Sequence, residues 1–216
     1  MKSLIIKDLY NISHNSKSLI MMLLFFAVLF IPTQGISAYV VTSGLLCSIM
    51  IVTTFAFDET CNWTKYALIT PVTRRDLVLG KFAVLSLFCC FGILNGVVIG
   101  GIGGYILSFF RDSVSLNPVE FLLSAVTGIC ISMLQGSTNV LLLYRFGTEK
   151  ARIMSLLSFI LPTGILAGLY KLLLLSNIAG EQPSFGILAS LFVLLTVIWV
   201  FFMYRLSYNT FLKQEL

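Results

Sequence analysis

The chain has 216 residues, of which 58% are hydrophobic and only 11% charged, with a formal net charge of +5 and a mean hydropathy of +0.99. A soluble domain carries about 25% charged residues, so this composition excludes a water-soluble globular protein. The five cysteines lack CxxC spacing and His14 is the single histidine, which favours neither a zinc site nor a disulfide framework. We therefore expect an all-α integral membrane protein that forms one domain over residues 1–216.

Residues 1–17 predict an amphipathic helix. Ile5, Leu9 and Ile12 recur at i, i+4 and i+7 and form one apolar stripe, while Asp8 lies away from it. A helix with one such stripe is typical of segments that lie in the membrane interface. We expect it along the cytoplasmic leaflet, and an unstructured tail is the alternative.

Uncharged runs predict six transmembrane helices. A helix needs about 20 apolar residues to cross the bilayer, so the run 18–57 suits two spans, with the sequence PTQGIS at 32–37 as the turn between them. The run 82–110 is long for one helix and too short for two. The other runs predict one span each, at 121–144, 153–170 and 182–204.

The lysines and arginines predict the orientation. With six spans, all 14 of them except Arg111 and Lys171 fall on one side of the membrane. Cytoplasmic loops carry the excess of basic residues. Both termini and the loops 58–81 and 145–152 are therefore expected in the cytoplasm of a bacterial cell, with the chain in its plasma membrane. The net charge then reflects orientation and contact with membrane lipid, and it requires no nucleic-acid partner.

The first cytoplasmic loop, 58–81, is rich in charge between two apolar runs. A charged residue at mid-membrane costs roughly 2.5–3.5 kcal/mol, so most of this loop is expected at or beyond the membrane surface. Pro71 disfavours helix at the residue before it and divides the loop. Before it, the sequence predicts a short helix over about 60–69, with Trp63, Tyr66, Ala67 and Thr70 on one face.

After the proline, the sequence TRRD from Thr73 to Asp76 is similar to a capping box, with Asp in place of Glu or Gln. The third span is therefore expected to begin at Arg74. A surface helix, a proline corner and a capped span would transmit force from a protein docked beneath to the helix above. From the residues alone, an ordinary hairpin with Trp63 and Tyr66 as interface anchors is the alternative.

This loop resembles the first cytoplasmic loop of type-2 ATP-binding-cassette permeases. The shared pattern is DE...W.KY.L..PV.RR..V.GK over 58–81, and the whole chain looks like the small six-span bacterial permeases that include exporters of phenol-soluble modulins and antimicrobial peptides. The resemblance implies a coupling helix, within 58–76, that fits a groove on a separate ATPase subunit. Trp63 and Tyr66 would be its apolar anchors, the basic residues would face the ATPase or lipid, and the two acidic residues would close the second span. The implied coupling residues are Asp58, Glu59, Trp63, Tyr66, Leu68, Pro71, Arg74, Arg75 and Lys81.

The second cytoplasmic loop has the sequence YRFGTEKAR at 144–152. By the same resemblance, Arg145, Glu149 and Lys150 would form a secondary contact with the ATPase. A tight turn with charges that stop membrane transfer is the alternative.

Small and polar residues recur inside the predicted spans. Glycines every four residues in the third span form GxxxG units, which let another helix, of this chain or of a dimer partner, approach closely. A hinge or break near 100–104 is the alternative. Polar residues at mid-span either bond across helices or line a substrate pathway. The two sets are Gly92, Gly96, Gly100 and Gly104, and Asn95, Gln135, Ser137, Thr138 and Asn139.

The sequence contains no GxxxxGK[ST] and no HExxH motif, so we expect a chain that is not an enzyme and holds no cofactor, with ATP and Mg²⁺ on its partner. We interpret it as the permease subunit of an ATP-driven exporter of amphipathic peptides or other hydrophobic substrates. Two permease chains, identical or homologous, would work by alternating access with two ATPase subunits. A membrane protein that binds a toxic peptide or anchors a partner without transport is the alternative. A secondary transporter is disfavoured because no acidic or histidine residue lies at a predicted mid-membrane position.

Overall fold

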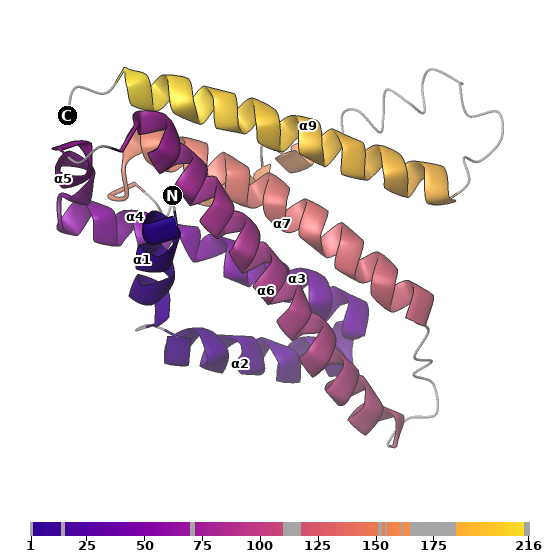
Figure 1. Ribbon diagram of the computed structural model, residues 1–216. Coiled ribbons are helices and arrows are strands. Elements are labelled where there is room, and N and C mark those ends of the chain that lie inside the picture. The colour runs from indigo at the N-terminus through magenta and orange to yellow at the C-terminus, as the bar shows by residue number, and fades with distance from the viewer. Residues whose placement is uncertain are drawn as a thin grey trace.

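The computed structural model describes residues 2–13, 16–69, 72–109, 118–150, 153, 155–160, 162–164 and 185–213 (Figure 1). The regular structure of these residues is helical, as the apolar runs predict. The helices are α1 (Lys2–Ser13), α2 (Ser16–Gln34), α3 (Ile36–Ile49), α4 (Ile51–Thr60), α5 (Trp63–Ile69), α6 (Arg74–Ser108), α7 (Pro118–Phe146) and α9 (Phe185–Leu212), with a shorter apolar helix at Ser155–Gly164.

Five segments of the described chain are long and apolar enough to cross a membrane. The second of them joins α3 and α4 into one span. The fifth span expected from the sequence, 153–170, lies largely outside the described residues, so a total of six stays a prediction. The five segments are Ser16–Gln34, Ile36–Thr60, Arg74–Leu107, Val119–Phe146 and Phe192–Leu212.

The turn between the first two spans is confirmed. Gly35 alone separates α2 from α3, and its φ of 91° lies in the left-handed region, which glycine adopts without steric cost. Pro32 lies inside the last turn of α2. The chain therefore reverses direction at the residue in the PTQGIS sequence that has no side chain.

Helix α3 is central and packs most extensively on α6 and α7. A Cβ atom on Gly92 would lie 2.8 Å from the Ser43 carbonyl oxygen, and one on Gly96 would lie 3.0 Å from the Val40 Cα. The Ser43 hydroxyl uses this closeness to donate a hydrogen bond of 2.9 Å to the Gly92 carbonyl oxygen. Gly100 and Gly104 are buried on the same helix. In this structure Gly92, Gly96 and Gly100 pack α6 against α3 of the same chain.

Helix α6 is continuous from Arg74 to Ser108, so the alternative of a break near 100–104 is wrong. At 1.5 Å per residue its 35 residues extend about 52 Å. This exceeds the roughly 30 Å of a bilayer's hydrocarbon core. The surplus length is enough for the first turns of α6 to extend beyond a layer of that thickness, and they meet the segments gathered at that end of the molecule.

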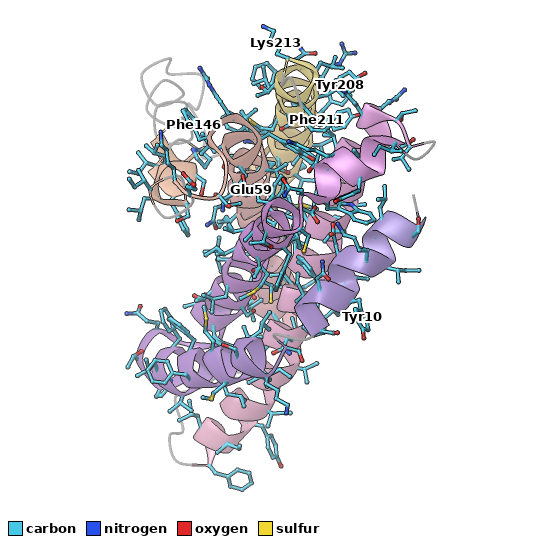
Figure 2. The ribbon with its side chains drawn as sticks, turned by 90° about the vertical axis from the view of Figure 1, so that its left-hand side faces the viewer. Tyr10, Glu59, Phe146, Tyr208, Phe211 and Lys213 are labelled. Atoms are coloured by element: carbon cyan, nitrogen blue, oxygen red, sulfur yellow. The ribbon has the colours of Figure 1, made fainter. Side chains whose placement is uncertain are left out.

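Those segments lie together at one end of the long helices. Figure 1 shows α1, α5, the start of α6 and the C-terminal part of α9 at this end, which we call the coupling end. Figure 2 views it directly and shows Glu59 of α4, Phe146 of α7 and Phe211 of α9 there. Helix α1 and the C-terminal end of α9 thus lie at the same end of the long helices.

Candidate coupling surface

The start of α6 is a capping box, as predicted. The Thr73 hydroxyl oxygen accepts a hydrogen bond of 3.2 Å from the Asp76 backbone N–H, and the Asp76 carboxylate accepts one of 3.3 Å from the Thr73 N–H. These two bonds satisfy backbone donors that the helix itself leaves unpaired. The box defines where α6 begins, directly after the segment that follows α5.

Helix α5 is the short surface helix, but its exposed face differs from the predicted one. Tyr66 and Ile69 are 63% and 82% exposed, whereas Ala67 is buried. Trp63 is half-buried, and the Lys7 ammonium lies 4.6 Å from its ring centroid. The tryptophan therefore faces α1, where a cation contacts its ring. Together with the exposed Lys65, Tyr66 and Ile69 form what we call the α5 outer face.

Three further residues of the predicted face or loop are not placed by the structure. The Leu68 side chain, Thr70 and Pro71 lie outside the described residues. The proline corner inferred from the sequence therefore stays a prediction.

Four charged side chains from three helices form a closed ring of ion pairs beside α5, which we call the charge ring. The Lys81 ammonium lies 3.0 Å from Asp8 Oδ2 and 2.6 Å from Asp58 Oδ2. The Lys7 ammonium lies 3.1 Å from Asp8 Oδ1 and also pairs with Asp58 Oδ1. Each lysine bridges both aspartates, so the formal charges balance within the ring.

The charge ring corrects two expectations. Lys81 is 7% exposed, so the prediction that its side chain faces an ATPase or lipid is wrong: the two carboxylates hold it between α1 and α4. In α1 the buried positions are Leu4, Asp8 and Ile12, and Leu9 is 39% exposed. The helix is confirmed over an unstructured tail, but its buried stripe includes Asp8 because Lys81 supplies the opposite charge.

The two arginines at the start of α6 have separate surroundings. Arg74 donates hydrogen bonds of 3.0 and 3.1 Å to the carbonyl oxygens of Phe211 and Leu212, at the C-terminal end of α9. A cation at this position satisfies carbonyls that the helix leaves unpaired and opposes the negative end of its dipole. Arg75 is exposed and lies at the edge of a groove described below.

Glu59 joins the two loops that the sequence predicts to be cytoplasmic. Its carboxylate accepts hydrogen bonds of 3.1 and 3.2 Å from the Thr148 backbone N–H, and it also accepts one from the Thr148 hydroxyl. Gly147, with a φ of 73°, makes the turn that presents this N–H. The side chains of the second loop point outward near this contact: Arg145, Glu149 and Lys150 are all exposed.

The polar residues at mid-span are buried, except Asn95, which is half-buried. The Thr138 hydroxyl donates to the Ser158 carbonyl oxygen at 3.2 Å, which is a bond across helices, while Ser137 bonds back to Leu134 of its own helix. Among the described residues, the side-chain amides of Gln135 and Asn139, 2% and 0% exposed, have no hydrogen-bond partner, and neither does the Asn95 amide oxygen. Thr138 thus forms a hydrogen bond between helices, as one of the two predicted uses requires.

A groove of about 630 Å³ lies between α6, α7 and α9, and the sequence did not predict it. Its walls are almost entirely apolar, and Arg75 stands at its coupling end. No local sequence pattern predicts such a groove, because each of its walls comes from a different helix. Its lining includes Leu79, Phe82, Met133, Val197, Phe201 and Tyr204.

Comparison with known proteins relates the chain to a transporter family. The family model described as ABC-2 family transporter protein matches residues 3–212. A search of curated proteins found no match, and a search of solved structures found none either. The family consists of non-catalytic membrane subunits that normally work with an ABC ATPase. Because the match spans nearly the whole chain, this multi-pass membrane protein belongs to the ABC-2 transporter family, as a permease subunit.

Proposed function

We propose that this chain is the permease of an ATP-driven exporter and that the α5 outer face docks on a separate ATPase subunit. One observation carries the proposal: at the coupling end, Tyr66 and Ile69 expose 63% and 82% of their surfaces on a short helix whose other face is buried. Large exposed aromatic and aliphatic side chains at such a site are typical of protein interfaces. The exposed Lys65, Arg145, Glu149 and Lys150 supply a polar rim.

The remaining parts follow from this assignment. Two permease chains, identical or homologous, assemble with two ATPase subunits, and ATP and Mg²⁺ bind only to the ATPases. The chain acts as one domain in a bacterial cytoplasmic membrane, with α1 and the end of α9 in the cytoplasm. Closure of the ATPases moves α5 and shifts the spans between inward-open and outward-open states.

The groove supports an amphipathic or apolar substrate. Its apolar walls suit hydrocarbon or apolar peptide side chains, and the single cation at its coupling end, Arg75, suits a polar or anionic group. Amphipathic peptides are the leading class in this proposal, followed by lipids and drugs. Asn95, Gln135 and Asn139 are candidates for a pathway that forms when the helices rearrange, because the Asn95 amide oxygen and the Gln135 and Asn139 amides lack partners among the described residues.

Site-specific cross-linking tests the docking proposal. A photoreactive amino acid at Ile69, in α5, is expected to capture a soluble ATPase in intact membranes, identified by mass spectrometry and by its nucleotide-binding motifs. The matched control is the same probe at Phe109, which is 75% exposed at the opposite end of α6.

Capture of ATPase at Phe109 and not at Ile69 would reject the assignment of the coupling end. Capture of no nucleotide-binding protein at either position, in membranes that contain the probe-bearing chain, would favour a non-transporting anchor or immunity protein. The double variant Tyr66→Ala/Ile69→Ala is expected to lose co-purification of the ATPase, whereas Trp63→Ala acts on the contact with α1 instead.

A further inference from the structure

We propose that Lys7, Asp8, Asp58 and Lys81 are positioning residues that tie the N-terminal helix α1 to the base of α5 and to α6, so that these elements move as one body. The consequence for transport rests on the proposed function; the tie itself does not. In this view α1 is a part of the coupling device, and anchoring the chain to the membrane surface is only one of its roles.

The ring connects three helices that the sequence separates widely. Asp8 comes from α1, Asp58 from the last turn of α4, and Lys81 from the third turn of α6. Asp58 is five residues before Trp63, where α5 begins after a tight turn that holds Asn62 at a φ of 49°. A displacement of α5 therefore acts on Asp58 first, through a short and constrained segment.

The surroundings of the ring make its ion pairs strong and specific. The side chains of Asp8, Lys81 and Asp58 are 4%, 9% and 12% exposed, so water screens them little. The Lys81 ammonium also lies 5.0 Å from the Phe55 ring centroid, and that of Lys7 lies 4.6 Å from the Trp63 centroid. Both cations are thus held by two carboxylates and one aromatic ring each.

Stability alone does not account for such a ring. Burying charges costs desolvation energy that the ion pairs only partly offset, and well-packed apolar residues at the same places are often at least as stable. What a buried ionic cluster adds is one defined arrangement, because any shift of one helix separates opposite charges in a poorly screened environment. That property suits a contact that must transmit movement between helices without letting them shift relative to each other.

Two double variants of equal net charge distinguish loss of the ion pair between α1 and α4 from a general loss of charged groups. Lys81→Met/Asp8→Asn leaves Lys7 and Asp58, an ion pair that still joins α1 to α4. Lys81→Met/Asp58→Asn leaves Lys7 and Asp8, a pair within α1 alone. Both variants remove one cation and one anion from the ring, and both remain neutral there.

The measurement is the distance between α1 and α5 in the purified chain in lipid nanodiscs, without any ATPase. Spin labels are placed at Tyr10→Cys and Ile69→Cys, where the side chains are 77% and 82% exposed and Tyr10 points away from the protein body (Figure 2). The exposed Cys61 and Cys90 are first replaced by serine. Pulsed electron paramagnetic resonance then reports the distance distribution.

We expect one narrow distance in the parent chain and in Lys81→Met/Asp8→Asn, and loss of the single distance in Lys81→Met/Asp58→Asn. Lys17→Met, an exposed lysine of α2 outside the ring, is the charge control and should leave the distance unchanged. Indistinguishable distributions in the two double variants would overturn the proposal. If the Asp58→Asn double variant does not fold, Lys7→Gln tests the same point: Lys81 still bridges Asp8 and Asp58, so a broadened distance there would also overturn it.

The transport consequence is measured separately in the assembled complex. Transport per ATP hydrolysed should fall in Lys81→Met/Asp58→Asn and be retained in Lys81→Met/Asp8→Asn, while cross-linking of Ile69 to the ATPase persists in both. A lost tie without this fall would refute the role in coupling. Absence of any ATPase partner would refute the proposed function and leave the distance result standing.

Discussion

Replacing Gly92 by alanine tests the close contact between α3 and α6. A Cβ atom there would lie 2.8 Å from the Ser43 carbonyl oxygen, which is backbone, and 2.8 Å from Cys47 Cβ, which moves only with the backbone. No rotation of a flexible side chain relieves either contact. The two helices must therefore separate, and the hydrogen bond from the Ser43 hydroxyl to the Gly92 carbonyl oxygen, now 2.9 Å, lengthens with them.

Two contributions lower the free energy of unfolding of Gly92→Ala, and a third raises it. Overpacking a well-packed contact costs about 1–3 kcal/mol. A hydrogen bond between membrane helices contributes on average about 0.6 kcal/mol. Alanine recovers up to about 1 kcal/mol of helix propensity relative to glycine. We therefore expect Gly92→Ala to lower the free energy of unfolding by about 1–3 kcal/mol.

The assay is reversible unfolding in mixed micelles with increasing SDS, followed by tryptophan fluorescence. Gly101→Ala on the same helix is the matched control, because among the described residues no atom beyond the helix's own neighbouring backbone lies within 4 Å of a Cβ at that position. It gains helix propensity without a clash and should raise the free energy of unfolding by up to about 1 kcal/mol. Equal stabilisation by both variants would show that α3 does not press on the glycine ridge and would refute the packing argument.

Two further predictions concern the coupling end. Thr73→Ala removes the acceptor for the Asp76 N–H and should lower the stability of the first turn of α6 by about 1 kcal/mol, measured as faster hydrogen exchange there. Thr73→Ser should behave like the parent. Unchanged exchange in the alanine variant would contradict the capping box. Glu59→Gln weakens the charge-assisted hydrogen bonds to Thr148, so hydrogen exchange at the Thr148 amide should accelerate. Glu149→Gln, an exposed control in the same loop as Thr148, should leave this exchange rate unchanged. Equal effects of the two variants would rule out the specific link between the loops.

The elements predicted well are those whose signals are local. Thr73 and Asp76 are three residues apart and make the capping box by themselves, so the start of α6 was predicted to the residue. The turn at Gly35 and the five described segments of membrane-spanning length depend on chain conformation and length alone. The buried faces of α1 and α5 were predicted less well, because Asp8 and Trp63 were assigned by polarity and helical spacing without their distant partners.

The amino-acid sequence by itself determined that this chain crosses a membrane several times and places a capped helix after a short amphipathic one, since apolar length, basic residues and capping act over a few neighbouring residues. Only the tertiary structure decided that Lys81 is buried between two aspartates, that Trp63 turns inward to Lys7, and that three helices leave an apolar groove. The physical reason is that the cost of burying a charge depends on the opposite charge beside it. In this protein Lys81 and Asp8 are far apart along the chain, and the packing of α1 on α6 brings them to 3.0 Å.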